Sequence, residues 1–139
     1  MATVVRPEIS NKNAYWISKH RHYELKHFCL QYSSWRKAYA ELQDMSIPSS
    51  AAERTPSSNL PGDPVSKYAI LRDQYYNKIK MIENAAIKAD PGLCRYILLG
   101  VTEGASYTYL KTKLDIPCGK DMYYDRYRKF FWLLDQARD

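Results

Sequence analysis

The sequence lacks the apolar segments that mark membrane and secreted proteins. Its longest apolar run, YILLGV, is far too short to cross a bilayer, so no membrane partner is expected. The first residues, MATVVRPEISNKN, contain no apolar core of the kind a signal peptide needs. We therefore expect a cytoplasmic protein.

Cysteine is also scarce. The three cysteines, Cys29, Cys94 and Cys118, are odd in number, lie far apart and form no C-x-x-C pair. This pattern is typical of free thiols in a reducing compartment. Cys118 precedes a predicted helix, where a thiol pKa can be lowered. A reactive thiol and an ordinary turn cysteine are therefore both open interpretations.

Recognisable catalytic motifs are missing. The sequence has no G-x-S-x-G, no Walker loop and no H-E-x-x-H, and paired carboxylates are sparse. We therefore expect no enzymatic activity and no cofactor.

The histidines all fall in one short stretch, KHRHYELKHFC. His20, Glu24 and His27 share one face of a predicted helix, which is the spacing of a metal site. Because Cys29 points roughly opposite to His20, no fourth ligand completes the set, and a polar stripe is favoured over a metal site. A further alternative is phosphate contact through the nearby cations Lys19, Arg21 and Lys26.

What the sequence does contain is positive charge and tyrosine. The 139 residues carry a formal net charge of +6 with a pI of about 9.2, which favours a polyanionic partner. Apolar residues make up 45%, enough to bury a core. Thirteen tyrosines stand against three phenylalanines, and tyrosine suits half-buried positions and interfaces.

The chain divides into three predicted parts. Residues 46–64, SIPSSAAERTPSSNLPGDP, hold four prolines and five serines, which is typical of a linker or surface loop. Residues 1–45 precede it as an N-terminal helical unit, and residues 65–139 follow it as a helical domain. The sequence of the linker does not decide whether the two units pack on each other.

The spacing of apolar residues predicts helices on both sides of this linker. Over 13–45 they recur every three or four positions, apart from one gap of eight. These residues are Ile17, Leu25, Phe28, Tyr32, Trp35, Tyr39 and Leu42. After the linker, Asp63 and Pro64 predict the start of a helix of about 25 residues. Its apolar stripe consists of Tyr68, Leu71, Tyr75, Ile79, Ile82 and Ala86.

Three more helices are expected at the C-terminus. They cover roughly 91–103, 106–115 and 119–137. Asp90 and Pro91 predict the start of the first, Gly104 predicts its end, and Ser106 predicts the cap of the second. No strand signal competes, so the fold class is all-α, a small helical bundle. A short helix joined by a tight turn to a longer one is typical of a helix-turn-helix, here over about 91–137, whose second helix enters the major groove of DNA.

The last helix has two faces when its residues are placed at about 100° each. The apolar arc consists of Tyr123, Tyr127, Phe130, Leu134 and Ala137, with Tyr124 and Phe131 at its edge. The opposite side consists of Asp121, Asp125, Arg128, Lys129 and Trp132, with Met122 and Arg126 between the two. Most of the aromatic residues are therefore expected to belong to the core, with polar residues outward on the first turns.

The charge of this region favours DNA. Residues 105–130 hold six basic and three acidic side chains, a net charge of +3. The expected base-reading residues are Lys120, Met122, Asp125, Arg126 and Lys129. The expected phosphate contacts are Ser106, Lys111, Lys113 and Arg128. A solvated charged face is the alternative interpretation for each of these residues.

A family resemblance runs through DPGLCRYILLGVTEGASYTYLKTKLDIPCGKDMYYDRYRKFFWLLDQ. A Glu-Gly pair ends an apolar helix, a serine caps the next, and the last helix combines tyrosines, basic residues and a terminal apolar run. These residues are Glu103, Gly104, Ser106, Tyr107, Leu110, Leu114, Ile116, Tyr123, Tyr124, Arg126, Arg128, Leu133 and Leu134. Over about residues 64–136 the chain resembles the C-terminal DNA-binding domain of sigma factors, and more specifically the sigma-like regulators of phage late genes, of the RinA and ArpU type.

The resemblance implies a transcription regulator of phage or prophage type that binds double-stranded promoter DNA, with RNA polymerase as a second candidate partner. The family pattern has a small residue where Lys111 stands, glycine where Asp115 stands and serine where Pro117 stands. Tyr123 and Tyr124 come about two residues later than in the pattern.

Two other functions stay open on the sequence. One is a helical protein-interaction module that docks through its tyrosine-rich and tryptophan-bearing surface. The other is a DNA-packaging recognition subunit, similar to a small terminase, which would form a ring and use the same helix-turn-helix.

Overall fold

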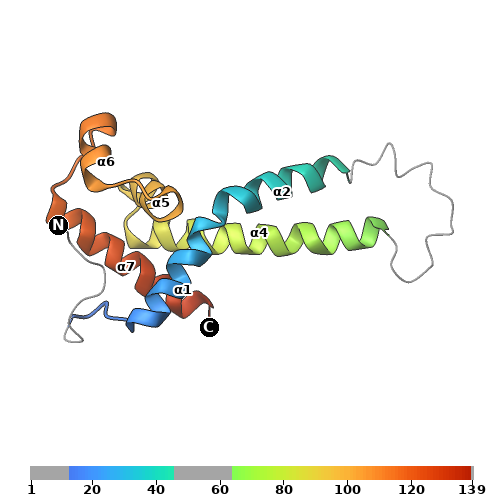
Figure 1. The fold of residues 1–139 in the computed structure, drawn as a ribbon, viewed down its shortest axis with the longest axis horizontal. Coiled ribbons are helices and arrows are strands. Elements are labelled where there is room, and N and C mark those ends of the chain that lie inside the picture. The colour runs from blue at the N-terminus through green and yellow to red at the C-terminus, as the bar shows by residue number, and fades with distance from the viewer. Residues whose placement is uncertain (1–12, 46–63, 139) are drawn as a thin grey trace. The chain divides into compact units, whose positions relative to one another are not determined.

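The described part of the chain is built from helices alone. The structure, a computed structural model, describes residues 13–45 and 64–138 (Figure 1). These residues form α1 (Lys19–Leu30), α2 (Tyr32–Met45), α4 (Pro64–Ala89), α5 (Cys94–Glu103), α6 (Tyr107–Leu114) and α7 (Lys120–Arg138). The predicted all-α fold class is confirmed. The predicted cap Asp63 and the predicted linker up to that residue lie outside the described residues.

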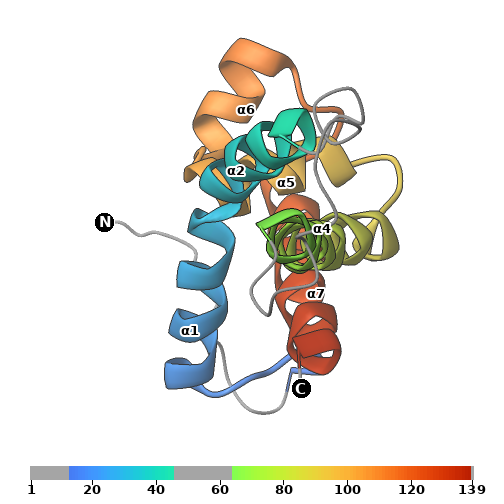
Figure 2. The ribbon, with the colours of Figure 1, turned by 90° about the vertical axis from the view of Figure 1, so that its right-hand side faces the viewer.

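The helices belong to two compact units whose division differs from the predicted domains. The larger unit comprises Met1–Gln31 and Met81–Asp139, and the smaller unit comprises Tyr32–Lys80. In the larger unit α1, α5 and α7 pack against one another, and Figure 2 shows α1 beside α7. The predicted N-terminal unit of residues 1–45 is therefore divided, because its first helix completes the core of the C-terminal helices.

The larger unit has a core drawn from all of its helices. Its fully or nearly fully buried apolar side chains are Leu25, Phe28, Cys29, Ile82, Ala85, Ala86, Ala89, Leu93, Ile97, Val101, Leu110, Ile116, Tyr123, Phe130, Phe131 and Leu134. Burying one such large side chain contributes about 1.5–3 kcal/mol. The spacing of these residues at three and four along each helix explains why the sequence pattern already indicated helices.

The smaller unit pairs α2 with the first part of α4. Tyr32, Trp35 and Leu42 on α2 are buried, and the rings of Tyr39 and Tyr76 lie 5.9 Å apart. The ammonium group of Lys78 lies 5.1 Å from the centre of the Trp35 ring, a cation–π contact. These contacts join the predicted stripe of α2 to Tyr76 and Lys78, which lie beside the predicted stripe of α4.

The first helix begins later than the apolar pattern predicts. Residues 13–18 form a turn, in which the side-chain oxygen of Asn13 accepts a hydrogen bond from the Tyr15 amide at 2.8 Å. The Ser18 hydroxyl then caps α1 by accepting from the Arg21 amide at 3.3 Å. The sequence predicted a helix or a helix pair over 13–45, and the structure has a turn at the start of this region followed by two helices, α1 and α2.

The start of α5 is also later than predicted. Asp90 does accept backbone hydrogen bonds, but from the amides of Gly92 at 2.9 Å and Leu93 at 3.2 Å. These bonds close a turn over residues 91–93, and the helix begins at Cys94. The prediction that Asp90 caps the helix and Pro91 starts it was therefore wrong by three residues, because the carboxylate stabilises a turn in front of the helix.

The remaining boundaries follow their local signals. Gly104 ends α5 with a left-handed backbone at φ 73°, and the Ser106 hydroxyl caps α6 by accepting from the Tyr109 amide at 3.1 Å. Asp115 ends α6, also left-handed, at φ 54° and ψ 51°. It is the one non-glycine residue with positive φ within the described part of the chain.

None of the described helices combines the length and the apolar character needed to cross a membrane.

The left-handed backbone at Asp115 leads to a stability prediction. A Cβ atom in this conformation costs about 1–2 kcal/mol relative to glycine, and aspartate tolerates it better than alanine does. We expect Asp115→Gly to be at least as stable as the parent protein and more stable than Asp115→Ala by about 1 kcal/mol. Urea unfolding of the three proteins measures the difference. Equal stability of the glycine and alanine variants would contradict the left-handed conformation.

Candidate nucleic-acid interface

The candidate interface is built on α7, whose aromatic face is buried. Tyr123, Phe130, Phe131 and Leu134 are at most 1% exposed. The prediction placed Phe131 only at the edge of this face, but α1 covers it, with the His22 ring 4.7 Å away in an edge-on arrangement. Ala137, predicted to lie in the core, is exposed, because the buried stripe of α7 ends at Leu134.

Trp132 shows a second effect of the N-terminal residues on α7. The sequence placed it on the outward side of the helix. In the structure it is half-buried, with the Tyr15 ring 5.6 Å from its own. Residues far apart in the sequence therefore cover more of α7 than its own periodicity predicts, and they cover its C-terminal half.

The N-terminal half of α7 is fixed by its close approach to α5. Gly100 lies against Tyr123 so closely that a Cβ atom at residue 100 would overlap the tyrosine hydroxyl, whereas the ring carbon Cζ would lie 3.5 Å away. The Tyr123 hydroxyl has no hydrogen-bond partner among the described residues. Burial raises the pKa of this phenol far above its usual range. The glycine therefore admits the tyrosine ring, and the ring sets the distance between the two helices.

The turn before α7 is held by α6. The Tyr107 hydroxyl donates a hydrogen bond to the Cys118 carbonyl at 2.7 Å, and the Tyr107 ring lies 5.8 Å from that of Tyr123. Leu110 and Ile116 are buried, and Leu114 is half-buried. The short helix and the turn thus pack onto the same core that holds α7.

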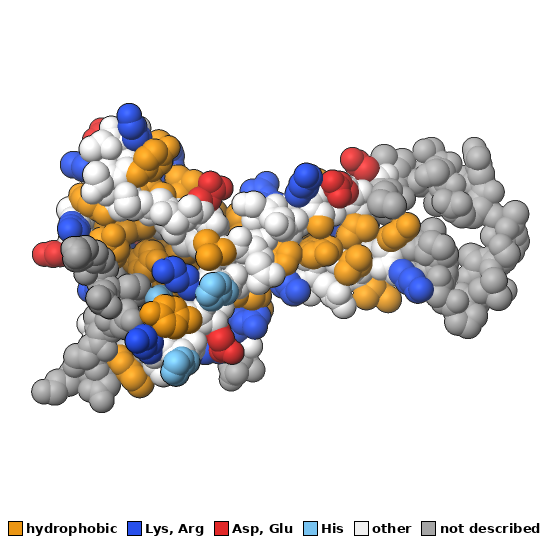
Figure 3. Space-filling view, viewed as in Figure 1, with side chains coloured by type: hydrophobic (Ala, Val, Ile, Leu, Met, Phe, Trp, Pro, Cys, Tyr) orange, Lys and Arg blue, Asp and Glu red, His pale blue; other side chains and the backbone are white. Residues whose placement is uncertain are grey.

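The predicted phosphate-contacting residues differ in their availability. Lys111 and Lys113 are exposed on α6, where Figure 3 shows Lys and Arg side chains at the surface. The Ser106 hydroxyl already accepts a hydrogen bond as the cap of α6, although it can still donate one. Arg128 is half-buried, and its Nε has no hydrogen-bond partner among the described residues.

The predicted base-reading residues fall into two groups. Lys120 and Met122 are exposed on the first turn of α7, Met122 to 44%, and Lys129 further along is half-buried. Asp125 and Arg126 are paired with each other through Arg126 Nη1. The structure therefore leaves Lys120 and Met122 exposed on the first turn of α7 and engages Asp125 and Arg126 in ion pairs within the protein.

Arg126 has a second carboxylate partner that the sequence gave no means of finding. Its Nε donates to Asp90 Oδ2 at 3.0 Å, across 36 positions of sequence. The Asp90 side chain is 18% exposed and the Arg126 side chain 31%. Hydrogen bonding to Asp90, together with that to Asp125, raises the pKa of the Arg126 guanidinium. This pair joins α7 to the turn that precedes α5.

Cys118 lies close to this pair. Burial raises the pKa of its thiol, and the nearby Asp90 carboxylate raises it further, while Lys111 and Arg126 act in the opposite direction. The interpretation of Cys118 as a thiol of lowered pKa is therefore wrong. Desolvation and a neighbouring negative charge outweigh the cations, and the thiol is favoured over the thiolate.

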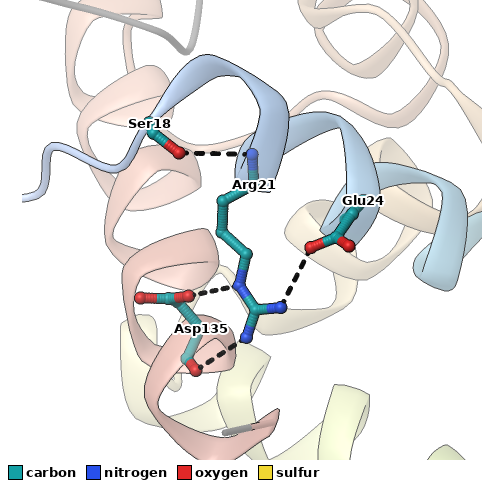
Figure 4. A network of polar contacts seen from close by, with 4 residues as sticks. All are labelled: Ser18, Arg21, Glu24 and Asp135. Atoms are coloured by element: carbon teal, nitrogen blue, oxygen red, sulfur yellow. Dashed lines mark hydrogen bonds and ion pairs between the residues drawn. The ribbon is translucent and has the colours of Figure 1, made fainter.

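The C-terminal half of α7 is tied to α1 through Arg21 (Figure 4). The Arg21 Nε donates to Asp135 Oδ1 at 2.6 Å, its Nη2 to the Asp135 carbonyl at 3.4 Å, and its Nη1 to Glu24 Oε1 at 3.1 Å. Arg21, considered from sequence as a phosphate contact, is thus engaged within the protein.

Across the residues that the structure describes, no group of three His, Cys, Asp or Glu side chains is arranged to hold a metal ion.

No family model, curated protein or solved structure matches this chain. Function is therefore inferred from the residues and geometry of the chain itself.

The contact between Gly100 and Tyr123 can be tested with three variants. We expect Gly100→Ala to destabilise the protein by about 1–3 kcal/mol, because the added methyl group overlaps the tyrosine hydroxyl. We expect Tyr123→Phe to be neutral or stabilising, because it removes a buried hydroxyl without a partner. The double variant is expected to recover most of the loss in thermal unfolding. An additive loss in the double variant would place the two residues out of contact.

Proposed function

We propose that the protein binds double-stranded DNA through α6 and α7 and acts as a transcription regulator of phage or prophage type, with RNA polymerase as a second candidate partner. In this proposal α5, α6 and α7 form a sigma-like helix-turn-helix, and α7 is the helix that enters the major groove. Two observations support the proposal: the net positive charge of the chain, and the exposed side chains on α6 and on the first turn of α7.

One observation carries the proposal furthest. Asp115, which ends α6, has the left-handed backbone that glycine adopts most readily. The sigma-like pattern has glycine at this position. The left-handed backbone at Asp115 is one that glycine adopts readily, which supports the proposal in spite of the different residue. Gly104 and Ser106 end and start their helices in the order of the same pattern.

The exposed first turn of α7 supplies groups suited to base edges. Lys120 can donate to the O6 and N7 atoms of guanine, and Met122 can make apolar contact with the methyl group of thymine. Lys111 and Lys113 on α6 are placed in this proposal on the phosphate backbone, which fixes position without reading sequence. Ser106 keeps its hydroxyl as a donor that can add a phosphate contact, whereas the Nε of the half-buried Arg128 is enclosed in the protein and does not face solvent.

A protein-interaction module is the second candidate, and one feature of the smaller unit favours it. On the first part of α4, Ile70 is 57% exposed, Leu71 39% and Tyr76 44%, and Figure 3 shows hydrophobic side chains at the surface there. Exposed apolar side chains that lie together are typical of surfaces that bind other proteins. If the protein is a DNA-binding regulator, the same apolar surface of α4 would bind a protein partner in addition to the DNA.

Salt dependence of DNA binding tests the proposal. We expect the logarithm of the binding constant for random duplex DNA to fall linearly with the logarithm of salt concentration, by about 0.9 per phosphate contact. The double substitution Lys111→Gln with Lys113→Gln is expected to weaken binding to all sequences equally and to reduce the slope by about 1.8. Fluorescence anisotropy from low to moderate salt measures both.

Lys26 on α1 provides a matched control, because it is exposed and lies on a helix outside the proposed interface. We expect Lys26→Gln to leave the slope unchanged. A reduction of the slope by about 0.9 in Lys26→Gln, with none in the double variant, would place the DNA on α1 instead. The absence of binding at low salt would refute DNA recognition and favour the protein-interaction module. A ring assembly in light scattering would favour the packaging subunit.

A further inference from the structure

The ion pair between Asp90 and Arg126 joins α7 to the turn before α5. Asp90 uses both of its oxygens. Oδ1 accepts from the amides of Gly92 and Leu93 in the turn before α5, and Oδ2 accepts from Arg126 Nε on α7 at 3.0 Å. One carboxylate therefore joins the entry of α5 to the second turn of α7.

The guanidinium of Arg126 is already satisfied on two sides. Its Nε faces Asp90 and its Nη1 faces Asp125, so two carboxylates surround one positive charge. An arginine that reads guanine presents two N–H groups in parallel to O6 and N7. To do so, Arg126 would have to break its ion pairs with Asp90 and Asp125. An ion pair that is partly shielded from water keeps its geometry better than one at the open surface.

We infer that Arg126 and Asp90 are positioning residues, which clamp the first turns of α7 to the turn before α5 so that Lys120 and Met122 face outward. Tyr107 also holds the preceding turn through the Cys118 carbonyl, so that the start of α7 is tied to the core of the larger unit at two points. This inference rests on the proposed function for what Lys120 and Met122 contact. It replaces the sequence-based prediction that Arg126 reads a base.

Two substitutions isolate the clamp. Asp90→Asn keeps the side-chain oxygen that caps Gly92 and Leu93 but removes the charge that holds Arg126. Arg126→Gln removes the guanidinium. Lys26→Gln is the matched control, because it removes one positive charge from an exposed position on α1, outside the proposed interface.

The first readout is amide hydrogen exchange, which needs no DNA. We expect Asp90→Asn and Arg126→Gln each to speed exchange at Tyr123–Tyr127 about fivefold or more through local opening, with little change at Phe130–Leu134. The double variant is expected to exchange no faster than either single variant, because both remove the same pair. Unchanged exchange at Tyr123–Tyr127, or additive effects in the double variant, would overturn the clamp.

The second readout separates positioning from base reading. In a selection from a random duplex library, we expect Arg126→Gln to keep the base preferences of the parent protein while all affinities fall by a similar factor of about three to ten. Asp90→Asn is expected to behave in the same way. Loss of preference at one base pair in Arg126→Gln, with that preference kept in Asp90→Asn, would make Arg126 a base reader and overturn the inference. If the parent protein binds no duplex, the proposed function fails, and the exchange measurements alone decide the clamp.

Discussion

The burial of the aromatic face of α7 is the constraint on which the rest of the larger unit depends. Tyr123, Phe130 and Phe131 can leave water only if α1 and α5 both lie against this helix. Gly100 provides the space on α5, and the Arg21–Asp135 pair fixes α1 at the other end. Once these contacts are made, the exposed residues of α7 are confined to its two ends, 120–122 and 136–138.

Local signals let the sequence predict most of the fold. Gly104 and Ser106 act on neighbouring backbone groups, so their effect is readable without tertiary structure. The predicted start of α5 at Pro91 was wrong because a carboxylate before Pro-Gly can close a turn as well as cap a helix, and Asp90 closes a turn. The burial of Phe131 was not predictable from α7 alone, because α1 covers this side chain, and Ala137 is exposed because the buried stripe of α7 ends at Leu134.

The candidate site was only partly readable from sequence. The helical spacing placed Lys120 and Met122 outward, and they are exposed. It also placed Arg126 among the outward residues, because a helical wheel contains no information on a carboxylate 36 positions away. The association of α1 with the C-terminal helices was hidden in the same way, since it depends on contacts such as that of His22 with Phe131, which no periodicity marks.

The central claim is that the exposed first turn of α7 reads duplex DNA. Selection of the purified full chain against a random duplex library tests it most directly, with the variant Lys120→Ala and Met122→Ala in parallel. The account predicts that the parent protein enriches a defined short motif and that the variant loses preference within that motif while it still binds duplex. Enrichment of the same motif by both proteins, or of none by the parent, would contradict it.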